Sequence, residues 1–126
     1  MAVFDRAFHS SIPDEAAVYG LPHEYFSRGL KKFGFHGNSH EYVAMKATEF
    51  IETPLRRLNI ISCHLGNGAS VCAIQRGHSI DTSMGFSPLQ GLLMGTSPGD
   101  LDPERDTDLQ RGRGFILTAT MPQMKQ

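Results

Sequence analysis

The sequence predicts an α/β fold, and two observations carry that prediction. Residues 1–57 combine helical signals with loops, whereas residues 59–83 follow the period of β-strands. Many of the 13 glycines fall between residues 66 and 99 beside Asn, Asp, Ser and Thr, which indicates shaped loops that approach a ligand or adopt positive φ. A helical first part followed by a small sheet and glycine-rich loops is therefore expected.

Two helices are predicted in the first part of the chain. Pro13 suits the first position of a short helix over residues 13–16, because that position needs no N–H donor. A longer helix over residues 41–51 is expected to be capped by Asn38, with Glu41 three residues later in an arrangement resembling a capping box. Its apolar side would consist of Val43, Ala47, Phe50 and Ile51.

Three strands are predicted next, over residues 60–63, 71–74 and 78–82. The segments 66–68 and 75–77 join them, and both contain glycine, which favours tight turns between antiparallel neighbours. The sequence therefore predicts an antiparallel meander. The cysteines, Cys63 and Cys72, both lie in these strands without metal-binding spacing, and they are expected to be small buried thiols.

A short third helix is predicted after the strands. Ser87 would cap it, Pro88 would occupy its first turn, and Gln90 would take the third position. Leu92, Leu93 and Met94 follow, and Gly95 is placed to end the helix. After residue 103 the apolar pattern stops, so residues 104–126 are expected to be a poorly ordered, divergent tail.

Composition narrows the range of functions. The net charge of −1 over 126 residues offers no cluster of positive charge for nucleic acid or an anionic membrane. No apolar stretch approaches the roughly 20 residues that span a bilayer, and the first ten residues do not resemble a signal peptide. Small-molecule chemistry in the cytoplasm is the expectation, with no nucleic-acid or membrane partner.

The segment IISCHLGNGAS, residues 60–70, is the most informative one. A glycine turn between two strands can aim successive N–H groups at one point and so bind phosphate oxygens. An ordinary hairpin turn is the alternative interpretation, and the glycines of residues 66–68 alone do not separate the two.

A pair of histidines precedes the longer predicted helix. His36 and His40 stand four residues apart, but no glutamate follows His36 and no third ligand is evident, so a zinc site is the weaker interpretation. Glycines on both sides of the Phe35-His36 pair indicate a constrained turn. We expect His36 to donate a hydrogen bond to an anion or to be packed within the fold.

Acidic residues occur in two further segments. Asp5 closes a short apolar run and is either a turn former or a functional carboxylate. Asp81, Asp100 and Asp102 accompany hydroxyls and glycines in residues 81–103. That combination suits a site for Mg²⁺ and phosphate, and it also suits solvated turns.

Four segments taken in order, VFDRAFHSSIP, KKFGFHGNSH, ISCHLGNGASV and DTSMGFSPLQGLLMGTSPGDLDP, resemble the acetate kinase family over about residues 2–103. The resemblance implies the ribonuclease H-like fold of the actin, sugar kinase and chaperone ATPase superfamily, in which two α/β domains close over a nucleotide. It also implies phosphoryl transfer between ATP and acetate or a close short carboxylate, with Mg²⁺, in a homodimer. Propionate kinases share these motifs.

The resemblance also implies roles for single residues. Asp5 corresponds to a catalytic aspartate that organises magnesium and substrate, and His36 to the histidine that stabilises the phosphoryl group in transfer. Arg6 and Asn38 each stand where the family has threonine, and Ser97 stands where it has the arginine that stabilises the transition state. No residue is assigned as a metal ligand. The ATP phosphates would be bound by His64, Leu65, Gly66, Asn67 and Gly68.

A central fragment of an acetate kinase is the resulting prediction. Residues 1–58 would end the N-terminal domain and residues 59–103 would begin the C-terminal nucleotide-binding domain. Because Ser97 lacks the charge and reach of arginine, and because other family segments have no counterpart in this sequence, an inactive or weakly active chain is expected. The alternative is a non-catalytic remnant that binds nucleotide or phosphate, or that docks onto another protein.

Overall fold

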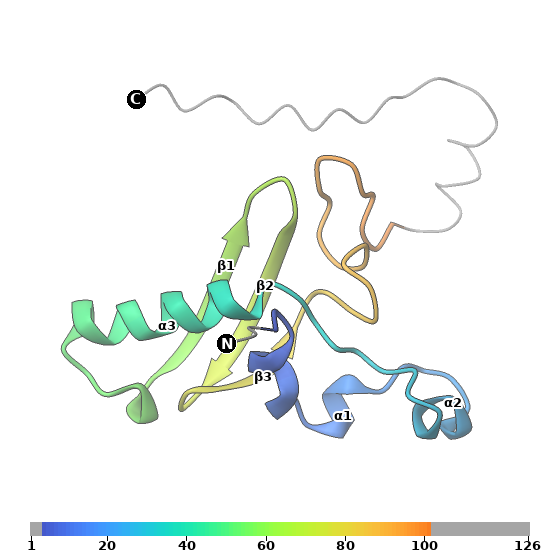
Figure 1. The fold of residues 1–126 in the computed structure, drawn as a ribbon, viewed down its shortest axis with the longest axis horizontal. Helices are drawn as coiled ribbons and strands as arrows, with labels where there is room; N and C mark the ends of the chain where they lie inside the picture. Colours follow the sequence, from blue (N-terminus) through green and yellow to red (C-terminus); the bar gives the residue numbers. More distant parts are fainter. Residues whose placement is uncertain (1–3, 102–126) are drawn as a thin grey trace.

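A computed structural model describes residues 4–101, in which helices cover one face of a three-stranded antiparallel sheet (Figure 1). The strands are β1 (Asn59–Leu65), β2 (Ala69–Gln75) and β3 (His78–Thr82), paired in that order. The α/β prediction and the meander are therefore confirmed; β1 and β2 are one or two residues longer at each end than predicted, and β3 has the predicted bounds. Residues 104–126, predicted to be a divergent tail, lie outside the described residues.

Glycine turns set the register of the meander, as predicted. Residues 76 and 77 join β2 to β3 with φ values of 53° for Arg76 and 94° for Gly77, the backbone that suits a two-residue hairpin. Ser62 pairs with Cys72, and His64 pairs with Ser70. Since side chains alternate along a strand, all four of these residues point to the same face of the sheet.

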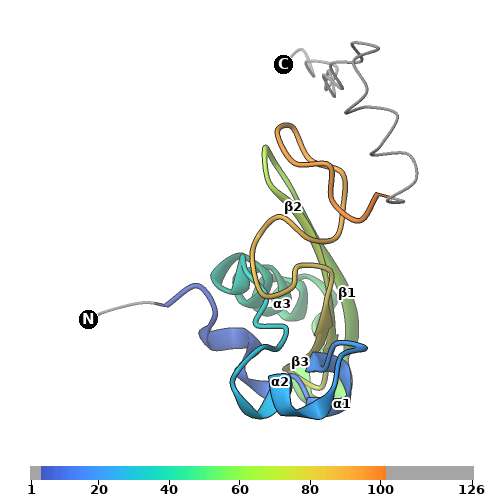
Figure 2. The same ribbon diagram turned by 90° about the vertical axis from the view of Figure 1, so that its right-hand side faces the viewer.

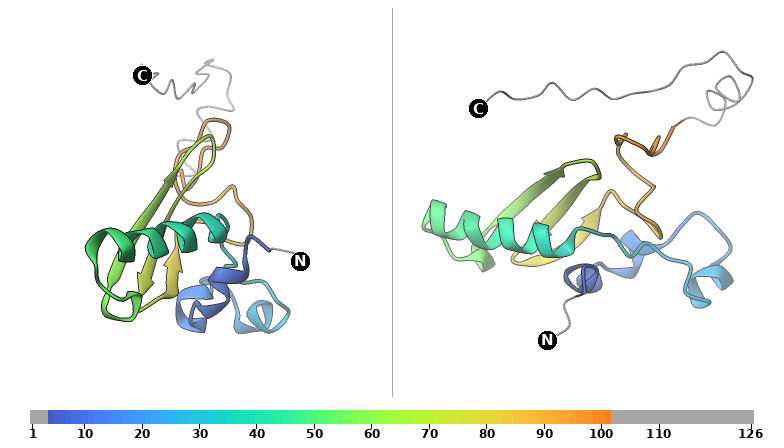
Figure 3. Two further views of the ribbon diagram at one scale, coloured as in Figure 1. Left: turned by 60° about the vertical axis from the view of Figure 1, so that its left-hand side comes forward. Right: turned by 45° about the horizontal axis from the view of Figure 1, so that its top comes forward.

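Helix α3 (Gly37–Ile51) lies across this face of the sheet (Figure 3). It begins earlier than predicted, and the capping residue is His36 in the left-handed conformation, not Asn38. The predicted apolar side is also wrong, because Val43, Ile51 and Phe50 are exposed and Phe50 keeps 91% of its surface. The helix instead packs through Gly37, His40 and Ala44, with Ala44 fully buried against Cys72 and Ile74 of β2.

Shorter helices flank the sheet. The 3₁₀ turn η1 (Ala7–Ser11) packs against β3, and α1 (Asp14–Ala17) follows with Pro13 just before its first residue. Helix α2 (His23–Ser27) and the 3₁₀ turn η2 (Leu55–Arg57) complete the described elements. Residues on both sides of the boundary predicted between positions 58 and 59 share one core, and that division into domains stays a prediction.

The helix predicted over residues 87–95 is wrong. Residues 83–101 form turns and bends, and Gly91 has a φ of 98°, which an α-helix does not allow. Tertiary hydrogen bonds determine this loop instead: Tyr19 Oη accepts from the Phe86 amide and donates to Gln90 Oε1, both at 2.7 Å. In Figure 2, where the sheet is seen nearly edge-on, the orange loop folds back beside the β1–β2 turn.

The opposite face of the sheet is largely uncovered. Ile61 and Leu65 keep 69% and 67% of their surfaces exposed, and Cys63 lies exposed between them. The expectation of a buried Cys63 is therefore wrong, because strand alternation turns it away from α3, whereas Cys72 is buried as predicted. An open cavity of about 490 Å³ lies on this face, lined by Ile61, Val71, Lys32 and Asp81 among others.

No helix within residues 4–101 is long and apolar enough to cross a bilayer.

Candidate functional site

A row of serine and histidine side chains fills the space between α3 and the sheet near the β1–β2 turn. Alternation along the strands directs Ser62, His64 and Ser70 toward α3. The beginning of α3 supplies His36 and His40, which are one helical turn apart and therefore on the same side of the helix. Two features predicted separately from the sequence thus lie together: the histidine pair at positions 36 and 40, and the glycine turn after β1.

His36 is held by three independent contacts. Its amide donates to Asp5 Oδ2 at 2.6 Å, which fixes a backbone with φ 60° and ψ 22° that non-glycine residues seldom adopt. Its Nδ1 lies 2.9 Å from Ser70 Oγ. Its ring stacks on the His64 ring with centroids 4.0 Å apart and an interplanar angle of 23°. The side chain is therefore fixed in position and orientation.

The tip of the β1–β2 hairpin approaches His36 closely. A Cβ placed on Gly68 would lie 3.3 Å from both Cε1 and Nε2 of His36, so the absence of a side chain lets the ring edge reach the turn. His64 is fixed by Ser39 of α3, whose Oγ lies 2.8 Å from its Nδ1. The Gly66 amide donates to Gly68 O at 2.9 Å and closes the turn.

Asp5 supports the start of α3 through its backbone as well as its carboxylate. The Gly37 amide donates to Asp5 O at 2.9 Å. Gly37 is packed so tightly there that a Cβ would overlap this carbonyl oxygen. Residue 5 thus holds two consecutive amides, those of His36 and Gly37, and the segment before η1 is tied to the beginning of α3.

His40 lies beneath this arrangement and is fully buried. Its Nδ1 is 3.0 Å from Ser62 Oγ, and its Nε2 is 2.8 Å from Ser70 Oγ. Burial lowers its pKa from 6.5 to about 4, with smaller effects from His9, His36 and His64 that outweigh the opposing effect of Asp5. Both ring nitrogens are occupied by hydroxyls, which argues against the zinc interpretation of the His36 and His40 pair.

His36 is also favoured in its neutral form. Partial burial lowers its pKa, the neighbouring His64 lowers it further, and Asp5 opposes the shift. Near neutral pH the histidines 36 and 40 are therefore uncharged. A neutral imidazole carries one N–H donor, so His36 can still donate one hydrogen bond to an anion.

Stability is expected to fall as the pH is lowered from about 6.5 to about 4. In this interval unfolded His40 binds a proton while folded His40 stays neutral, so protonation favours unfolding by about 3 kcal/mol once the pH reaches the folded pKa. Urea unfolding followed by circular dichroism at several pH values measures the slope. A His23→Gln variant, which removes an exposed histidine, should keep it. A flat profile between pH 7 and pH 4 would contradict the burial of His40.

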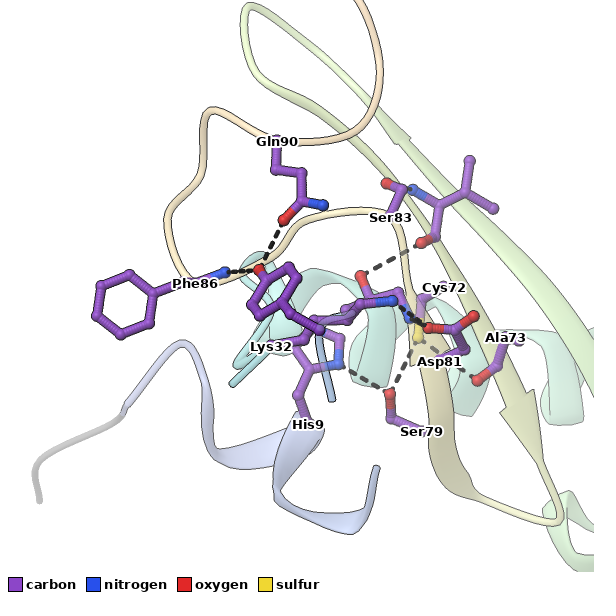
Figure 4. A network of polar contacts seen from close by, with 12 residues as sticks. His9, Lys32, Cys72, Ala73, Ser79, Asp81, Ser83, Phe86 and Gln90 are labelled. Carbon is purple, nitrogen blue, oxygen red and sulfur yellow. Dashed lines mark hydrogen bonds and ion pairs between the residues drawn. The ribbon is translucent and has the colours of Figure 1, made fainter. Parts of the chain in front are cut away.

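A second polar network joins η1 to β3 (Figure 4). His9 Nε2 donates to Phe35 O at 2.9 Å, so its Nδ1 accepts from Ser79 Oγ at 2.8 Å. Ser79 Oγ also lies 3.3 Å from Cys72 Sγ. Burial raises the pKa of the Cys72 thiol and lowers the pKa of His9. This network fixes the carbonyl side of Phe35, next to His36.

Ser97 lies in the loop beside the hairpin tip. It is 7% exposed, and its Oγ donates to Leu89 O at 2.9 Å. The adjoining Gly95 amide donates to Asn67 O at 3.2 Å, which brings the loop against the turn. The side chain of residue 97 therefore stabilises the loop itself in this structure.

The structure brings together most of the residues predicted from the sequence. Contacts link Asp5 to His36, His36 to His64 and His36 to Gly68. Leu65 is the exception, because its side chain points to the uncovered face of the sheet. Sequence reasoning did not identify the serines, and only the alternation of Ser62 with His64 along one strand could have indicated them. The missed residues that contact the histidines are Ser39, Ser62, Ser70 and Ser79.

The hairpin tip has the features of a phosphate site. Within residues 4–101 the amides of Asn67 and Gly68 donate to no backbone carbonyl, and His36 Nε2 lies close to Gly68. Magnesium in nucleotide sites takes one or two carboxylates and completes its coordination with phosphate oxygens and water. The described part of the chain has no cluster of three potential metal ligands, so Asp5 could serve only as a single carboxylate of that kind. The open cavity on the other face of the sheet does not include this site.

The chain matches the acetokinase family over residues 1–116, which continues beyond position 103, where the resemblance noted in the sequence stops. Acetate kinase of Shouchella clausii is 57% identical over 104 residues, covering 82% of this chain and 26% of that protein. Acetate kinase 1 of Listeria monocytogenes is 53% identical over 125 residues, covering 98% of this chain and 32% of that protein.

Solved structures show the same likeness. Acetate kinase of Porphyromonas gingivalis superposes with a TM-score of 0.79 at 40% identity, covering 91% of this chain and 29% of that one. A propionate kinase of Francisella tularensis superposes with a TM-score of 0.76 at 42% identity, covering 92% of this chain and 30% of that one. The chain thus spans between a quarter and a third of the length of these relatives.

Proposed function

Because this chain belongs to the acetokinase family, we propose that its hairpin tip and His36 form the phosphoryl-binding part of an acetate kinase site. The observation that carries the proposal is the close approach of His36 Nε2 to Gly68, beside two turn amides. The reaction would move the γ-phosphoryl group of ATP to a carboxylate oxygen of acetate, which leaves ADP and acetyl phosphate. A related short carboxylate such as propionate is an equally good acceptor for the residues described.

The chemistry of phosphoryl transfer assigns a task to each of these groups. Catalysis depends on positioning and on stabilising negative charge on the phosphoryl oxygens, for which preorganised N–H donors are suited. The Asn67 and Gly68 amides and the His36 ring would donate to those oxygens. Magnesium bound with ATP would neutralise phosphate charge, and Asp5 would contribute a carboxylate to it. Asp5 also keeps the His36 backbone in place.

Ser97 favours a second candidate function for this particular chain. Its hydroxyl is bonded to Leu89 O inside the loop, so it offers the phosphates neither charge nor reach. A site with phosphate-binding donors and no cation at this position is expected to bind Mg·ATP without transferring its phosphoryl group efficiently. Nucleotide or phosphate binding without catalysis is therefore the alternative, and it uses the same hairpin tip.

Gly68→Ala is expected to weaken binding of Mg·ATP and of inorganic phosphate about tenfold, or about 1.4 kcal/mol. The new methyl would press on the His36 ring and cover the turn amides, while the backbone of Gly68 needs no positive φ. Titrations of the ¹⁵N-labelled chain followed by chemical shifts give the dissociation constants.

Gly20→Ala is the matched control for this experiment. Gly20 also lies outside the positive-φ region, and a Cβ there would meet nothing within 4 Å. The control should bind as the unmodified chain does. Equal weakening by both substitutions, or no weakening by Gly68→Ala, would overturn the proposed position of the phosphate.

A further inference from the structure

Four side chains form a continuous line of hydrogen bonds that ends at the proposed phosphate site. Ser62 Oγ lies 3.0 Å from His40 Nδ1, His40 Nε2 lies 2.8 Å from Ser70 Oγ, and Ser70 Oγ lies 2.9 Å from His36 Nδ1. His40 and Ser70 are fully buried, and Ser62 is buried too. Each of the three contacts requires one hydrogen atom, so the positions of the hydrogens are coupled along the line.

Three arrangements of these hydrogens give each contact one hydrogen and keep both histidines neutral. A serine hydroxyl donates one hydrogen, and a neutral imidazole donates from one nitrogen and accepts at the other. The hydrogens can therefore all point from Ser62 toward His36, or all point from His36 toward Ser62. In the third arrangement His40 Nε2 and His36 Nδ1 both donate to Ser70 Oγ, which can accept two hydrogen bonds, and the hydroxyl hydrogen of Ser70 points out of the line.

The two buried hydroxyls, those of Ser62 and Ser70, decide between the three arrangements. His40 is the only hydrogen-bond partner that Ser62 Oγ has among residues 4–101. If the hydrogens pointed toward Ser62, its own hydroxyl hydrogen would be buried without an acceptor, which is costly. In the third arrangement the hydroxyl hydrogen of the fully buried Ser70 would have no acceptor either, because His40 and His36 are the only partners of Ser70 Oγ among residues 4–101. If all the hydrogens point toward His36, every hydrogen in the line has an acceptor. His40 then carries its proton on Nε2, Ser70 donates to His36 Nδ1, and the single proton of His36 lies on Nε2.

We propose that Ser62, His40 and Ser70 are positioning residues that hold His36 as the neutral Nε2–H tautomer and so direct its N–H toward the Gly66-Asn67-Gly68 turn. His36 Nε2 is the nitrogen that lies at the turn, 3.3 Å from the position of a Cβ on Gly68. The inference rests on the proposed function only in naming a phosphoryl oxygen as the acceptor. His36 thus donates to that oxygen without carrying a charge.

The same line of hydrogen bonds opposes protonation of His36. An imidazolium needs a hydrogen on Nδ1, where the Ser70 hydroxyl already points its own. Ser70 could turn away only by pointing its hydrogen at His40 Nε2, which also carries one, or by leaving that hydrogen buried without an acceptor. The charged and titratable groups around His40 are His9 from η1, His64 from β1, His36 itself and Asp5. Burial and the neighbouring histidines favour the neutral imidazoles, and Asp5 opposes them.

Two-bond ¹H–¹⁵N correlation spectra of the chain labelled at histidine test the proposal without any ligand. Both His36 and His40 should show only the Nε2–H tautomer at pH 7, and the buried His40 Nε2–H proton should exchange slowly with water. Ser70→Ala should convert His36 to a mixture of both tautomers. Ser79→Ala removes another fully buried hydroxyl, the one bonded to His9, and should leave His36 unchanged.

Detection of the Nδ1–H tautomer at His36 in the unmodified chain would overturn the proposal, and so would an unchanged His36 in a folded Ser70→Ala variant. If that variant does not fold, the unmodified chain still decides, since its tautomers are assigned directly. Phosphate binding is measured separately. A chain that shows the tautomers and binds no phosphate would refute the proposed function alone, and one that binds phosphate with Nδ1–H at His36 would refute this inference alone.

Discussion

Gly37→Ala is expected to lower the free energy of unfolding by about 3 kcal/mol, since overpacking against backbone that cannot yield is strongly destabilising. Gly37 is the first residue of α3, and a Cβ there would overlap the carbonyl oxygen of Asp5. Relief would require the Gly37 amide to leave Asp5 O, which it contacts at 2.9 Å. The measurement is urea unfolding followed by circular dichroism at 222 nm.

Gly37→Ala should also weaken the constraint that Asp5 places on the backbone of His36. The amides of His36 and Gly37 are both held by Asp5, so a shift of the helix start would loosen the left-handed backbone of His36. Gly20→Ala serves again as the control and should change stability by less than about 0.5 kcal/mol, as expected for a surface site. A Gly37→Ala variant as stable as this control would show that the contact between residue 5 and α3 is wrongly placed.

The 126-residue chain is expected to form acetyl phosphate from Mg·ATP and acetate at the background rate. An arginine that stabilises the transition state in phosphoryl transfer is worth about 10³ to 10⁵ in rate, and residue 97 is a serine bonded to Leu89 O. The relatives in addition have more than two thirds of their length outside the matched region. A hydroxamate assay on the purified chain measures the rate.

A His36→Ala variant distinguishes activity of this site from a contaminating kinase. The unmodified chain and the His36→Ala variant should both give only the background signal that the assay gives when no protein is added. Turnover by the unmodified chain that disappears with His36→Ala would contradict the expectation of an inactive chain and would show that the site works with Ser97. Equal turnover by both proteins would be assigned to contamination.

The strands could be predicted from the sequence because their determinants are local. Alternating apolar residues and a glycine at each turn fix the meander, and Arg76-Gly77 adopts the positive φ values that such a turn requires. The start of α3 could not be predicted. It depends on Asp5, which lies 31 residues before His36 in the sequence and holds its amide.

The conformation of the loop after β3 could not be predicted either, because it also depends on a residue far away in the sequence. Local signals around Ser87 and Pro88 favour a helix, but Tyr19, at a distance of 67 residues in the sequence, binds the Phe86 amide and helps to hold an irregular loop. The predicted apolar side of α3 is exposed because the helix packs through the small residues Gly37 and Ala44, which give little signal, and through the polar His40. Long-range contacts therefore overrode local propensity at both places.

The candidate site, like the fold, contains some features that could be predicted from the sequence and others that could not. Motif residues such as Asp5, His36 and Gly68 could be selected from the sequence, and the structure places His36 against both of the others. The stacking of His36 on His64 and the hydroxyl shared by Ser70 between two histidines could not be foreseen. They depend on the register of β1 with β2 and on the crossing of α3, which no single segment encodes.

Titration of the ¹⁵N-labelled chain with Mg·ATP, and separately with inorganic phosphate, tests the central claim most directly. The largest shifts should occur at the amides of Asn67 and Gly68 and at the His36 ring, and they should be reduced in Gly68→Ala and preserved in Gly20→Ala. Shifts confined to Lys32 and Asp81 at the open cavity, or no shifts at millimolar ligand, would show that the hairpin tip does not bind phosphate.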